Sequence, residues 1–575
     1  MPETSPSNFD SPLAASEPPL TRRTRIFLIA LFLLTAGIVL FHELGGFRTL
    51  GSHEVYAAVP AREMQRSGNW IVPIYGGLPR LRKPPLAYWV LSTSATIFGE
   101  FNEWVVRVPA AASAFLLAIL TGFWASRWYG KTAGWAAAFA QLTCIWVLIF
   151  SRKAEIDMML CLFTTAAMFL VGTQPKGESF RKGFVRWIGV WALISLAWLG
   201  KFHYGPAMVI APCGLFILIQ KRYRAVGNFF NPVGVLLFSA AVFIWPYLLL
   251  QQVPEALTVW RTQTVGRAVG EMGHKPLWFY IPHIFWLTLP WTPFAIAAVP
   301  ASWKRAWKEA DARERFLWVW LLTQFAIVTI SANKHKHYLN TALPMVSLLA
   351  GQGVSRLIAR IRQRGWRYNT RTAVVCSGTF LVAGVAVALL GIKKWPELMM
   401  PFVLMGALVA VGGIIANGFA RAKKPGMSAV ALGVIFLGCY ASMNAWIMPF
   451  RDHRQAVANF AQETRGELPD DQEISVYRMG ETSVVYYLES PVQRMESQAA
   501  LAKRLEEQGS LRVVTFETLA SEVTATGKGR IIKRMTVSPG VPRPKHAPLV
   551  LIELTKAKSG SRLPTQTASE NRAHQ

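Results

Sequence analysis

The sequence predicts an all-α polytopic membrane protein with about thirteen transmembrane helices, followed by a small α/β domain. Three observations predict this fold class. Hydrophobic residues make up 52% of the 575 residues and aromatic residues 12%, which is more than a soluble core of this length needs. Apolar runs long enough to cross a bilayer recur as far as Ile447. Beyond that residue the composition becomes charged, which indicates a separate soluble domain.

The chain is expected to begin with a disordered cytoplasmic segment at residues 1–25, because this stretch is rich in proline and serine. Arg22, Arg23 and Arg25 precede the first apolar run, and basic residues favour the cytoplasmic side of a span. A cleaved signal peptide is the alternative. The run 26–43 is as long as a membrane crossing and has no small-residue cleavage site after it, so we expect a retained first helix.

The remaining spans follow from the alternation of apolar runs with basic loops. A net charge of +29 would suggest nucleic acid as the partner of a soluble protein, but here Lys and Arg cluster between apolar runs, so no nucleic-acid partner is expected. If each basic loop is cytoplasmic, the spans of a transmembrane domain at 26–447 alternate around the loops and the C-terminus lies outside. The expected spans are 26–43, 106–126, 132–151, 157–173, 187–202, 204–220, 232–250, 280–300, 316–332, 338–355, 373–392, 398–420 and 427–447.

The first external loop, residues 44–105, is expected to carry surface helices. The stretch 84–98 is short for a bilayer crossing, and counting it as a span would place the basic loop 127–131 outside. We therefore predict a helix at the outer membrane surface, with Tyr88 and Trp89 as interfacial aromatics. A short true span is the alternative.

Residues 448–556 are predicted to form a soluble extracytoplasmic α/β domain, which the span count places outside the membrane. Residues 557–575 are expected to be a disordered tail. Strand-like runs occur at 474–477, 511–516 and 549–554, and a helix-like run occurs at 499–508.

The first external loop contains a distinctive sequence phrase. It reads A-R-E-M at 61–64, S-G-N-W at 67–70, Pro73, Gly77, and K-P-P-L-A-Y-W at 83–89. The phrase resembles the first external loop of the lipid-carrier-dependent glycosyltransferases that include 4-amino-4-deoxy-L-arabinose transferases and protein O-mannosyltransferases. The resemblance extends, more loosely, to S-A-N-K-H-K-H-Y at 331–338 and to the C-terminal domain.

This resemblance implies a GT-C fold in the bacterial inner membrane and an inverting transfer from an undecaprenyl-phosphate-linked sugar. The implied acceptor is a lipid, such as lipid A, or a glycan at the outer face, and membrane lipids surround the protein. The sequence has no G-x-x-x-x-G-K-[ST] loop for a nucleotide phosphate, which fits a lipid-linked donor.

Two carboxylates are candidates for a catalytic base, because deprotonating an acceptor hydroxyl assists its attack on the anomeric carbon. They are Glu54 and Asp157. The family's first loop has an Asp-Glu pair that matches His53-Glu54 here, so only Glu54 keeps a carboxylate. Asp157 matches the family's second acidic position. As the alternative, either residue could be a solvated loop or helix-cap carboxylate.

Cations beside the departing phosphate would stabilise the charge that accumulates there. Lys83 matches the family's phosphate-facing lysine, Arg267 resembles a phosphate-contacting arginine, and Tyr338 resembles the tyrosine of a family segment. Lys201 lies at the outer end of an expected span. The alternatives are that Lys83 snorkels to the interface, that Lys201 marks a helix end, and that Arg267 is solvated.

A divalent cation stays open as a cofactor, but no metal ligand is assigned. Arg82 stands where the family has a metal-site glutamate, and an arginine cannot ligate a cation. His274, His335 and His337 have suitable atoms but lack carboxylates at helical spacing. All five cysteines fall within expected spans, which disfavours a disulfide framework.

Two other classes of function stay open. A transporter or lipid flippase could use a similar bundle, but transporters usually place ionisable residues near the membrane midplane in pseudo-repeated halves, and no such repeat is evident. A membrane scaffold whose external domain binds a partner is the other alternative.

Overall fold

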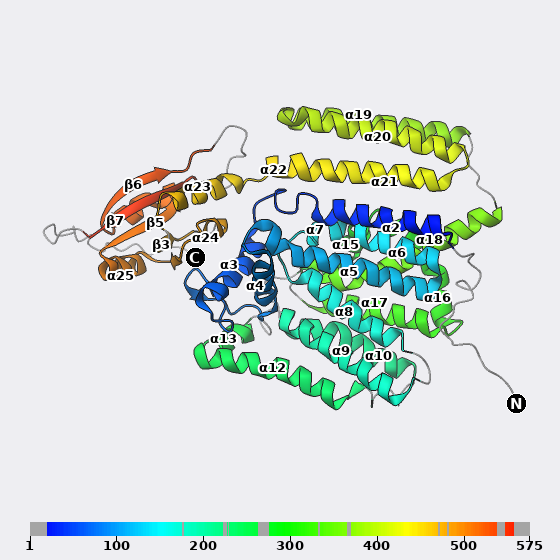
Figure 1. Cartoon of the computed structure of the whole chain (residues 1–575), viewed down its shortest axis with the longest axis horizontal. Helices are drawn as coiled ribbons and strands as arrows, with labels where there is room; N and C mark the ends of the chain where they lie inside the picture. The colour runs from blue at the N-terminus through cyan, green and yellow to red at the C-terminus, as the bar shows by residue number, and fades with distance from the viewer. Residues whose placement is uncertain are drawn as a thin grey trace, which may run out of the picture. The chain divides into compact units, whose positions relative to one another are not determined.

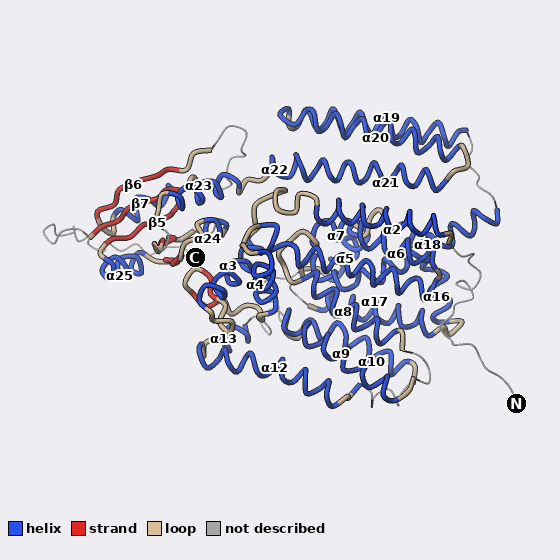
Figure 2. Tube along the Cα trace, in the orientation of Figure 1, coloured by secondary structure: helices blue, strands red, loops and turns tan. Residues whose placement is uncertain are grey.

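The computed structural model describes residues 20–556 apart from 175–177, 222–226, 228, 263–274, 332–333, 365–369, 470–471, 480–481 and 538–546. The chain divides into two compact units. Met1–Tyr75 and Pro79–Arg451 form the first unit, which is helical, and Gly76–Leu78 and Asp452–Gln575 form the second, which carries a sheet (Figures 1 and 2). The expected disordered tail at 557–575 lies outside the described residues, as do residues 1–19.

The first unit is a bundle of helices, and a short hairpin contains the chain boundary between the two units. Its α-helices are α2 Arg22–Ala36, α3 Ser52–Ser67, α4 Leu86–Phe98, α5 Glu103–Tyr129, α6 Lys131–Thr143, α7 Ile145–Phe150, α8 Asp157–Gly172, α9 Phe180–Lys201, α10 Tyr204–Ile219, α12 Pro232–Gln252, α13 Ala256–Arg261, α15 Tyr280–Leu287, α16 Thr292–Trp307, α17 Ala312–Ile330, α18 Leu343–Arg364, α19 Thr370–Lys394, α20 Met399–Arg421, α21 Pro425–Ser442 and α22 Met448–Phe450. Tighter or wider helical turns occur at η1 Gly37–Phe41, η3 Leu277–Phe279, η4 Lys336–Ala342, η5 Pro396–Leu398 and η6 Met443–Ile447, and the hairpin pairs β1 Ile74–Tyr75 with β2 Leu78–Pro79.

Among the described residues, eight helices are long and apolar enough to cross a membrane, or nine if one bent pair counts as a single span. Helices α4, α8 and α10 are apolar but shorter. The expectation of a helical, polytopic membrane protein is therefore confirmed, and the count of thirteen spans stays a prediction.

Two expected spans are not continuous helices. The span 132–151 is broken at Cys144, whose extended backbone (φ −68°, ψ 146°) separates α6 from α7. The span 280–300 is broken between α15 and α16, which are bent by 114°. Pro290 lies in that break, and proline disrupts a helix because it lacks an N–H donor and its ring clashes with the preceding turn.

Two helix boundaries also differ from the expectation. Helix α2 begins at Arg22, inside the segment expected to be disordered, because Thr21 Oγ1 accepts a 3.2 Å hydrogen bond from the Thr24 N–H and caps the helix. The expected span 338–355 starts as the 3-10 turn η4 before α18 takes over. A helix, α4, is present where the surface helix is expected, and its place at the membrane surface stays a prediction; Tyr88 is buried within the protein, so it differs from the expected interfacial aromatic.

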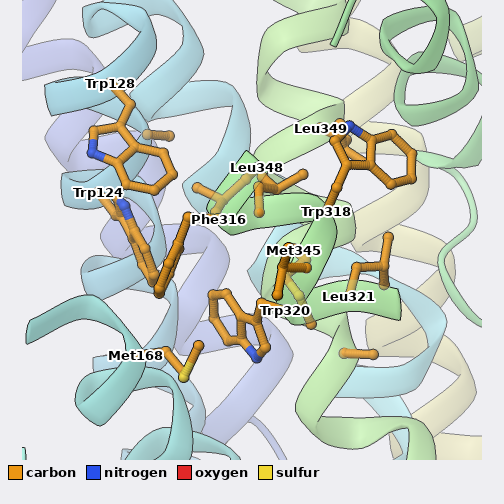
Figure 3. Packing of buried hydrophobic residues seen from close by; sticks show 14 of the residues in the cluster. Trp124, Trp128, Met168, Phe316, Trp318, Trp320, Leu321, Met345, Leu348 and Leu349 are labelled. Carbon is orange, nitrogen blue, oxygen red and sulfur yellow. The ribbon is translucent and has the colours of Figure 1, made fainter. Parts of the chain in front are cut away.

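The core of the first unit is aromatic and closely packed (Figure 3). Trp124 of α5 stacks on Trp320 of α17 with ring centres 5.3 Å apart. Helices α5 and α6 approach so closely at Gly122 that a Cβ atom there would lie 2.7 Å from the Cβ of Ala138. Tight packing of this kind holds helix ends in fixed positions, which a site assembled from several helices requires.

The second unit is a small α/β domain, as predicted. Its sheet has the strand order β4-β3-β5-β7-β6, in which β3 is parallel to β4 and β5, and β7 is antiparallel to β5 and β6. The strands are β3 Ile474–Tyr477, β4 Val492–Met495, β5 Ser510–Phe516, β6 Lys528–Arg534 and β7 Leu549–Thr555, and the helices are α23 Gln455–Gly466, α24 Ser483–Tyr487, α25 Gln498–Gln508 and α26 Ala520–Thr524.

Candidate functional site

Four of the predicted site residues come together at one end of the helical unit. Lys83 precedes α4, Asp157 is the first residue of α8, Lys201 is the last residue of α9, and Tyr338 lies in η4. Lys201 Nζ donates a 2.7 Å hydrogen bond to Asp157 Oδ1, and both side chains are largely buried. The ion pair therefore joins the start of α8 to the end of α9.

The Lys201 ammonium also contacts the rings of two tyrosines. Its Nζ lies 4.7 Å from the ring centre of Tyr338 and 5.0 Å from that of Tyr204. The Tyr204 hydroxyl donates a 2.8 Å hydrogen bond to the Tyr338 carbonyl, which fixes the two rings relative to each other. An ammonium between a carboxylate and two aromatic faces is strongly oriented. The sequence analysis did not single out Tyr204, although it directly follows Lys201-Phe202-His203.

Lys83 lies within electrostatic reach of Asp157, Lys201, Glu155 and Arg80. Burial lowers the pKa of Lys83, the Lys201 ammonium lowers it further, and the Asp157 carboxylate opposes both. Glu155 has its own partner, because one of its oxygens lies 3.9 Å from Lys153 Nζ. Lys83 and Lys201 together outweigh Asp157 by one positive charge, which suits an anionic ligand such as a phosphate.

Arg80 adds a further cation to this end of the unit. Its guanidinium lies over the ring of Tyr56, 3.9 Å from the ring centre, and 5.9 Å from the ring centre of Tyr75. The sequence offered a signal for it, since Arg80 opens the R-L-R-K run that leads to Lys83.

Glu54 is fully engaged by hydrogen-bond donors. Its Oε2 accepts from the Gly51 N–H at 2.8 Å and from Arg48 Nη2 at 3.0 Å. Its Oε1 accepts from Arg107 Nε at 2.9 Å and from the Ala154 N–H at 3.2 Å. Burial alone would raise the pKa of Glu54, but the Arg107 and Arg48 guanidiniums outweigh it and lower the pKa to about 2.

This geometry differs from the expectation that Glu54 is a base. A carboxylate with such a low pKa, and with donors on both oxygens, accepts a further proton poorly at neutral pH. Glu54 instead ties α3 to Arg107 of α5 and to the loop that leads into Asp157. A signal was present in the sequence, because a glutamate at the third helical position commonly accepts from the backbone N–H at the helix start.

His53, the neighbour of Glu54, has an exposed side chain. It lies within electrostatic reach of Lys83, Lys153, Asp157 and Arg80. Partial desolvation of the ring lowers the pKa of His53 although part of the side chain is exposed; Lys83 and Lys153 lower it further, and Asp157 opposes them. The sequence analysis noted His53 only as a departure from the family pattern.

Of the remaining candidates, His337 joins this group, because it lies within electrostatic reach of Asp157, Lys201 and Lys83 and its ring contacts that of Tyr338 at 4.7 Å between centres. Arg267 and His274 lie outside the described residues. The rings of His335 and His337 stack with centres 5.2 Å apart. Within the described part of the chain, no three His, Cys, Asp or Glu side chains are grouped closely enough to hold a metal ion.

Comparison with known proteins places this geometry in a family context. A family model described as dolichyl-phosphate-mannose-protein mannosyltransferase matches residues 82–248, which include Lys83, Asp157 and Lys201. A structure with the same fold is that of ArnT from Cupriavidus metallidurans bound to undecaprenyl phosphate. The TM-score is 0.72 at 19% identity, covering 93% of this chain and 99% of that one. The chain therefore has an ArnT-like GT-C fold.

Sequence relatives include undecaprenyl phosphate-alpha-4-amino-4-deoxy-L-arabinose arabinosyl transferases. The one from Enterobacter sp. (strain 638) is 27% identical over 356 residues, which cover 59% of this chain and 61% of the relative. The transferase 1 of Pseudomonas fluorescens (strain Pf0-1) is 26% identical over 424 residues, which cover 70% of this chain and 71% of the relative. The chain thus resembles transferases of the type that the first-loop phrase indicates.

Proposed function

We propose that this chain is an integral membrane glycosyltransferase that moves a sugar from an undecaprenyl-phosphate-linked donor to a lipid acceptor, such as lipid A, or to a glycan. The observation that carries the proposal is the grouping of Lys83 and Lys201 around Asp157, in a fold shared with a transferase crystallised with undecaprenyl phosphate. A transporter would not require this excess of cations over carboxylates at helix ends on one side of the bundle.

The proposed reaction is a single displacement. The acceptor oxygen forms a bond to the anomeric carbon on the face opposite to the phosphate, and the bond between that carbon and the phosphate oxygen breaks. Its electron pair leaves with undecaprenyl phosphate, and the configuration of the sugar is inverted. Negative charge grows on the phosphate as this bond breaks, and preorganised cations stabilise it most where water is excluded.

Each predicted residue receives a role in this proposal. Lys83 and Lys201 face the departing phosphate, and Asp157 and Tyr338 orient Lys201 through the 2.7 Å ion pair and the ring contact. Arg267 stays a predicted phosphate contact. Glu54 is assigned to positioning, because Arg107 and the other donors engage both of its oxygens.

The proposed orientation puts the N-terminus in the cytoplasm of a bacterium, the site at the outer face of the inner membrane, and the second unit outside. In support, basic residues cluster at helix ends remote from Asp157: Arg127 and Lys131 flank the α5–α6 connection, and Lys304, Arg305 and Lys308 lie at the end of α16. Single cysteines introduced at Lys308 and Glu506, both exposed, test this orientation. In a variant without the native cysteines, a membrane-impermeant thiol reagent applied to intact cells should label position 506 and not position 308.

The activity test uses the full chain in native membranes or reconstituted vesicles. Radiolabelled undecaprenyl-phosphate sugars and a lipid extract serve as donor and acceptor. Wild type should transfer label to the lipid fraction, and Lys83→Ala and Asp157→Asn should not. Lys131→Ala, an exposed lysine at the other end of the bundle, is the matched control and should transfer normally. Absence of transfer by wild type across the donor panel would refute the proposal.

A further inference from the structure

His53 and Glu54 are consecutive residues at the start of α3 with opposite environments. The Glu54 side chain is 1% exposed and bound by Arg107, Arg48 and two backbone N–H groups. The His53 side chain is exposed. Successive residues of a helix point about 100° apart, so the bonds that fix Glu54 also fix the direction in which His53 projects.

The charged groups that act on His53 come from three other segments. Arg80 and Lys83 belong to the segment before α4, Lys153 to the loop between α7 and α8, and Asp157 to α8 itself. Lys83 and Asp157 also lie within electrostatic reach of each other. The loop that leads into Asp157 is bound to Glu54 through the Ala154 N–H, so His53 lies close to the residues proposed to hold the donor phosphate.

We propose that His53 is the catalytic residue that accepts the proton of an acceptor hydroxyl, and that Glu54 is the positioning residue that aims it. This inference rests on the proposed transferase function. As the acceptor oxygen bonds to the anomeric carbon, its proton moves to an imidazole nitrogen and the sugar-phosphate bond breaks. The products are the glycosylated acceptor, undecaprenyl phosphate and protonated His53, which then loses its proton to water.

The other ionisable groups in the cluster fit this role less well. Lys83 and Lys201 are needed as cations, Asp157 Oδ1 is bound by Lys201, and Glu54 has donors on both oxygens. His337 also lies within electrostatic reach of Asp157, but its ring is partly buried against those of His335 and Tyr338, whereas the His53 side chain is exposed. A neutral imidazole keeps one nitrogen free to accept a proton. Partial desolvation and the cations Lys83 and Lys153 lower the pKa of His53, so the neutral form predominates at neutral pH, while the Asp157 carboxylate stabilises the imidazolium once it forms.

The test compares His53→Gln and His53→Asp with wild type over a range of pH, with kcat and kcat/KM measured for the acceptor at saturating donor. Wild type should lose activity on the acidic side as His53 becomes protonated. His53→Gln should lower kcat about 10²- to 10⁴-fold, and its pH–rate profile should no longer show the loss of activity at acidic pH (the acidic limb). His53→Asp should restore part of kcat, and its acidic limb should move to lower pH because a carboxyl group protonates at lower pH than imidazole.

His203→Gln is the matched control. His203 is also exposed and lies at the same end of the unit, but only burial shifts its pKa and no charged group acts on it. It should keep the wild-type pH profile. Thermal unfolding of all variants in detergent shows that they are folded.

The inference is overturned if folded His53→Gln keeps wild-type kcat, or if its acidic limb matches that of wild type. Because wild type is measured in the same assay, failure of the transferase function itself is distinguishable: wild type would then transfer no sugar at any pH.

Discussion

Arg107 Nε donates a 2.9 Å hydrogen bond to Oε1 of Glu54, and both side chains are almost completely buried. Arg107 also donates to the backbone carbonyls of Leu44 and Arg48, so it closes the segment that leads into α3. Its guanidinium lies 4.6 Å from the ring centre of Phe47. One buried ion pair thus connects the first loop, α5 and, through Glu54, the loop before α8.

Removing the charge of Glu54 should destabilise the fold strongly. Glu54→Gln leaves Arg107 buried without a counter-charge, and breaking a buried pair on one side typically costs about 3–5 kcal/mol. The unfolding temperature in detergent should therefore fall by many degrees. Glu63→Gln is the control, because Glu63 pairs with the exposed Arg66 and such surface pairs contribute less than about 1 kcal/mol. Equal unfolding temperatures for the two variants would contradict this role.

The same pair predicts how stability depends on pH. The pKa of Glu54 falls from an ordinary value of 4.5 to about 2 in the folded protein, so its ionised form stabilises the fold above pH 4.5. At 1.36 kcal/mol per pKa unit, this contribution is about 3 kcal/mol, and it is lost as the pH falls from about 4.5 to 2. In wild type the unfolding temperature should drop over that range more than in Glu54→Gln. Parallel curves for the two proteins would show that Glu54 titrates normally.

Asp157 and Lys201 should behave as one functional unit. Asp157→Asn and Lys201→Met each break the 2.7 Å ion pair, and each should lower kcat about 10²-fold or more because the phosphate loses an oriented cation. The double variant should be little worse than either single variant, because both remove the same interaction. The transfer rates of wild type, the two single variants and the double variant form a double-mutant cycle that measures this coupling. Multiplicative losses would mean that the two residues act independently.

Lys83 should contribute to binding of the carrier. A hydrogen bond to a charged group is worth about 1.5–3 kcal/mol, so Lys83→Ala should weaken binding of undecaprenyl phosphate about 10- to 150-fold. Lys83→Arg should recover part of the affinity because it keeps the charge. Binding of labelled undecaprenyl phosphate to purified protein measures this, with Lys131→Ala as the control. An unchanged affinity in Lys83→Ala would remove Lys83 from the phosphate site.

Sequence periodicity predicted the elements whose pattern is strong. The strand-like runs at 474–477, 511–516 and 549–554 correspond to β3, β5 and β7, and the helix-like run at 499–508 corresponds to α25. These segments carry apolar residues that pack in one core, so their pattern survives folding. Strands β4 and β6 were missed. The sequence of β6, K-G-R-I-I-K-R, is dominated by basic residues, as is common for an edge strand.

Breaks inside apolar runs were not predictable in the same way. Hydropathy alone cannot distinguish a continuous span from two helices, and the breaks at Cys144 and between α15 and α16 follow from local backbone geometry and packing. Pro290 was the one local signal in the second case.

Motif matching selected Lys83 and Asp157 as candidates and the span ends selected Lys201, but neither established that the three converge, nor which of His53 and Glu54 is buried. In the sequence, the adjacent residues His53 and Glu54 are equally plausible as catalytic groups. Which of them is buried depends on Arg107, which lies 53 positions later than Glu54 in the chain. No short motif contains that information, so a contact between distant helices had to be seen in three dimensions.

The end of the bundle remote from Asp157 has its own buried carboxylate, Glu314, which should matter for stability and not for transfer. Glu314 accepts hydrogen bonds from Ser302 at 2.6 Å and Gln352 at 3.2 Å and pairs with Arg305, so it joins α16, α17 and α18. Glu314→Gln should lower the unfolding temperature because it leaves Arg305 without its counter-charge, but affinity for undecaprenyl phosphate should stay at the wild-type value. Glu309→Gln, which breaks only the exposed pair with Lys304, is the control. Weaker carrier binding by folded Glu314→Gln would show that the two ends of the bundle are coupled.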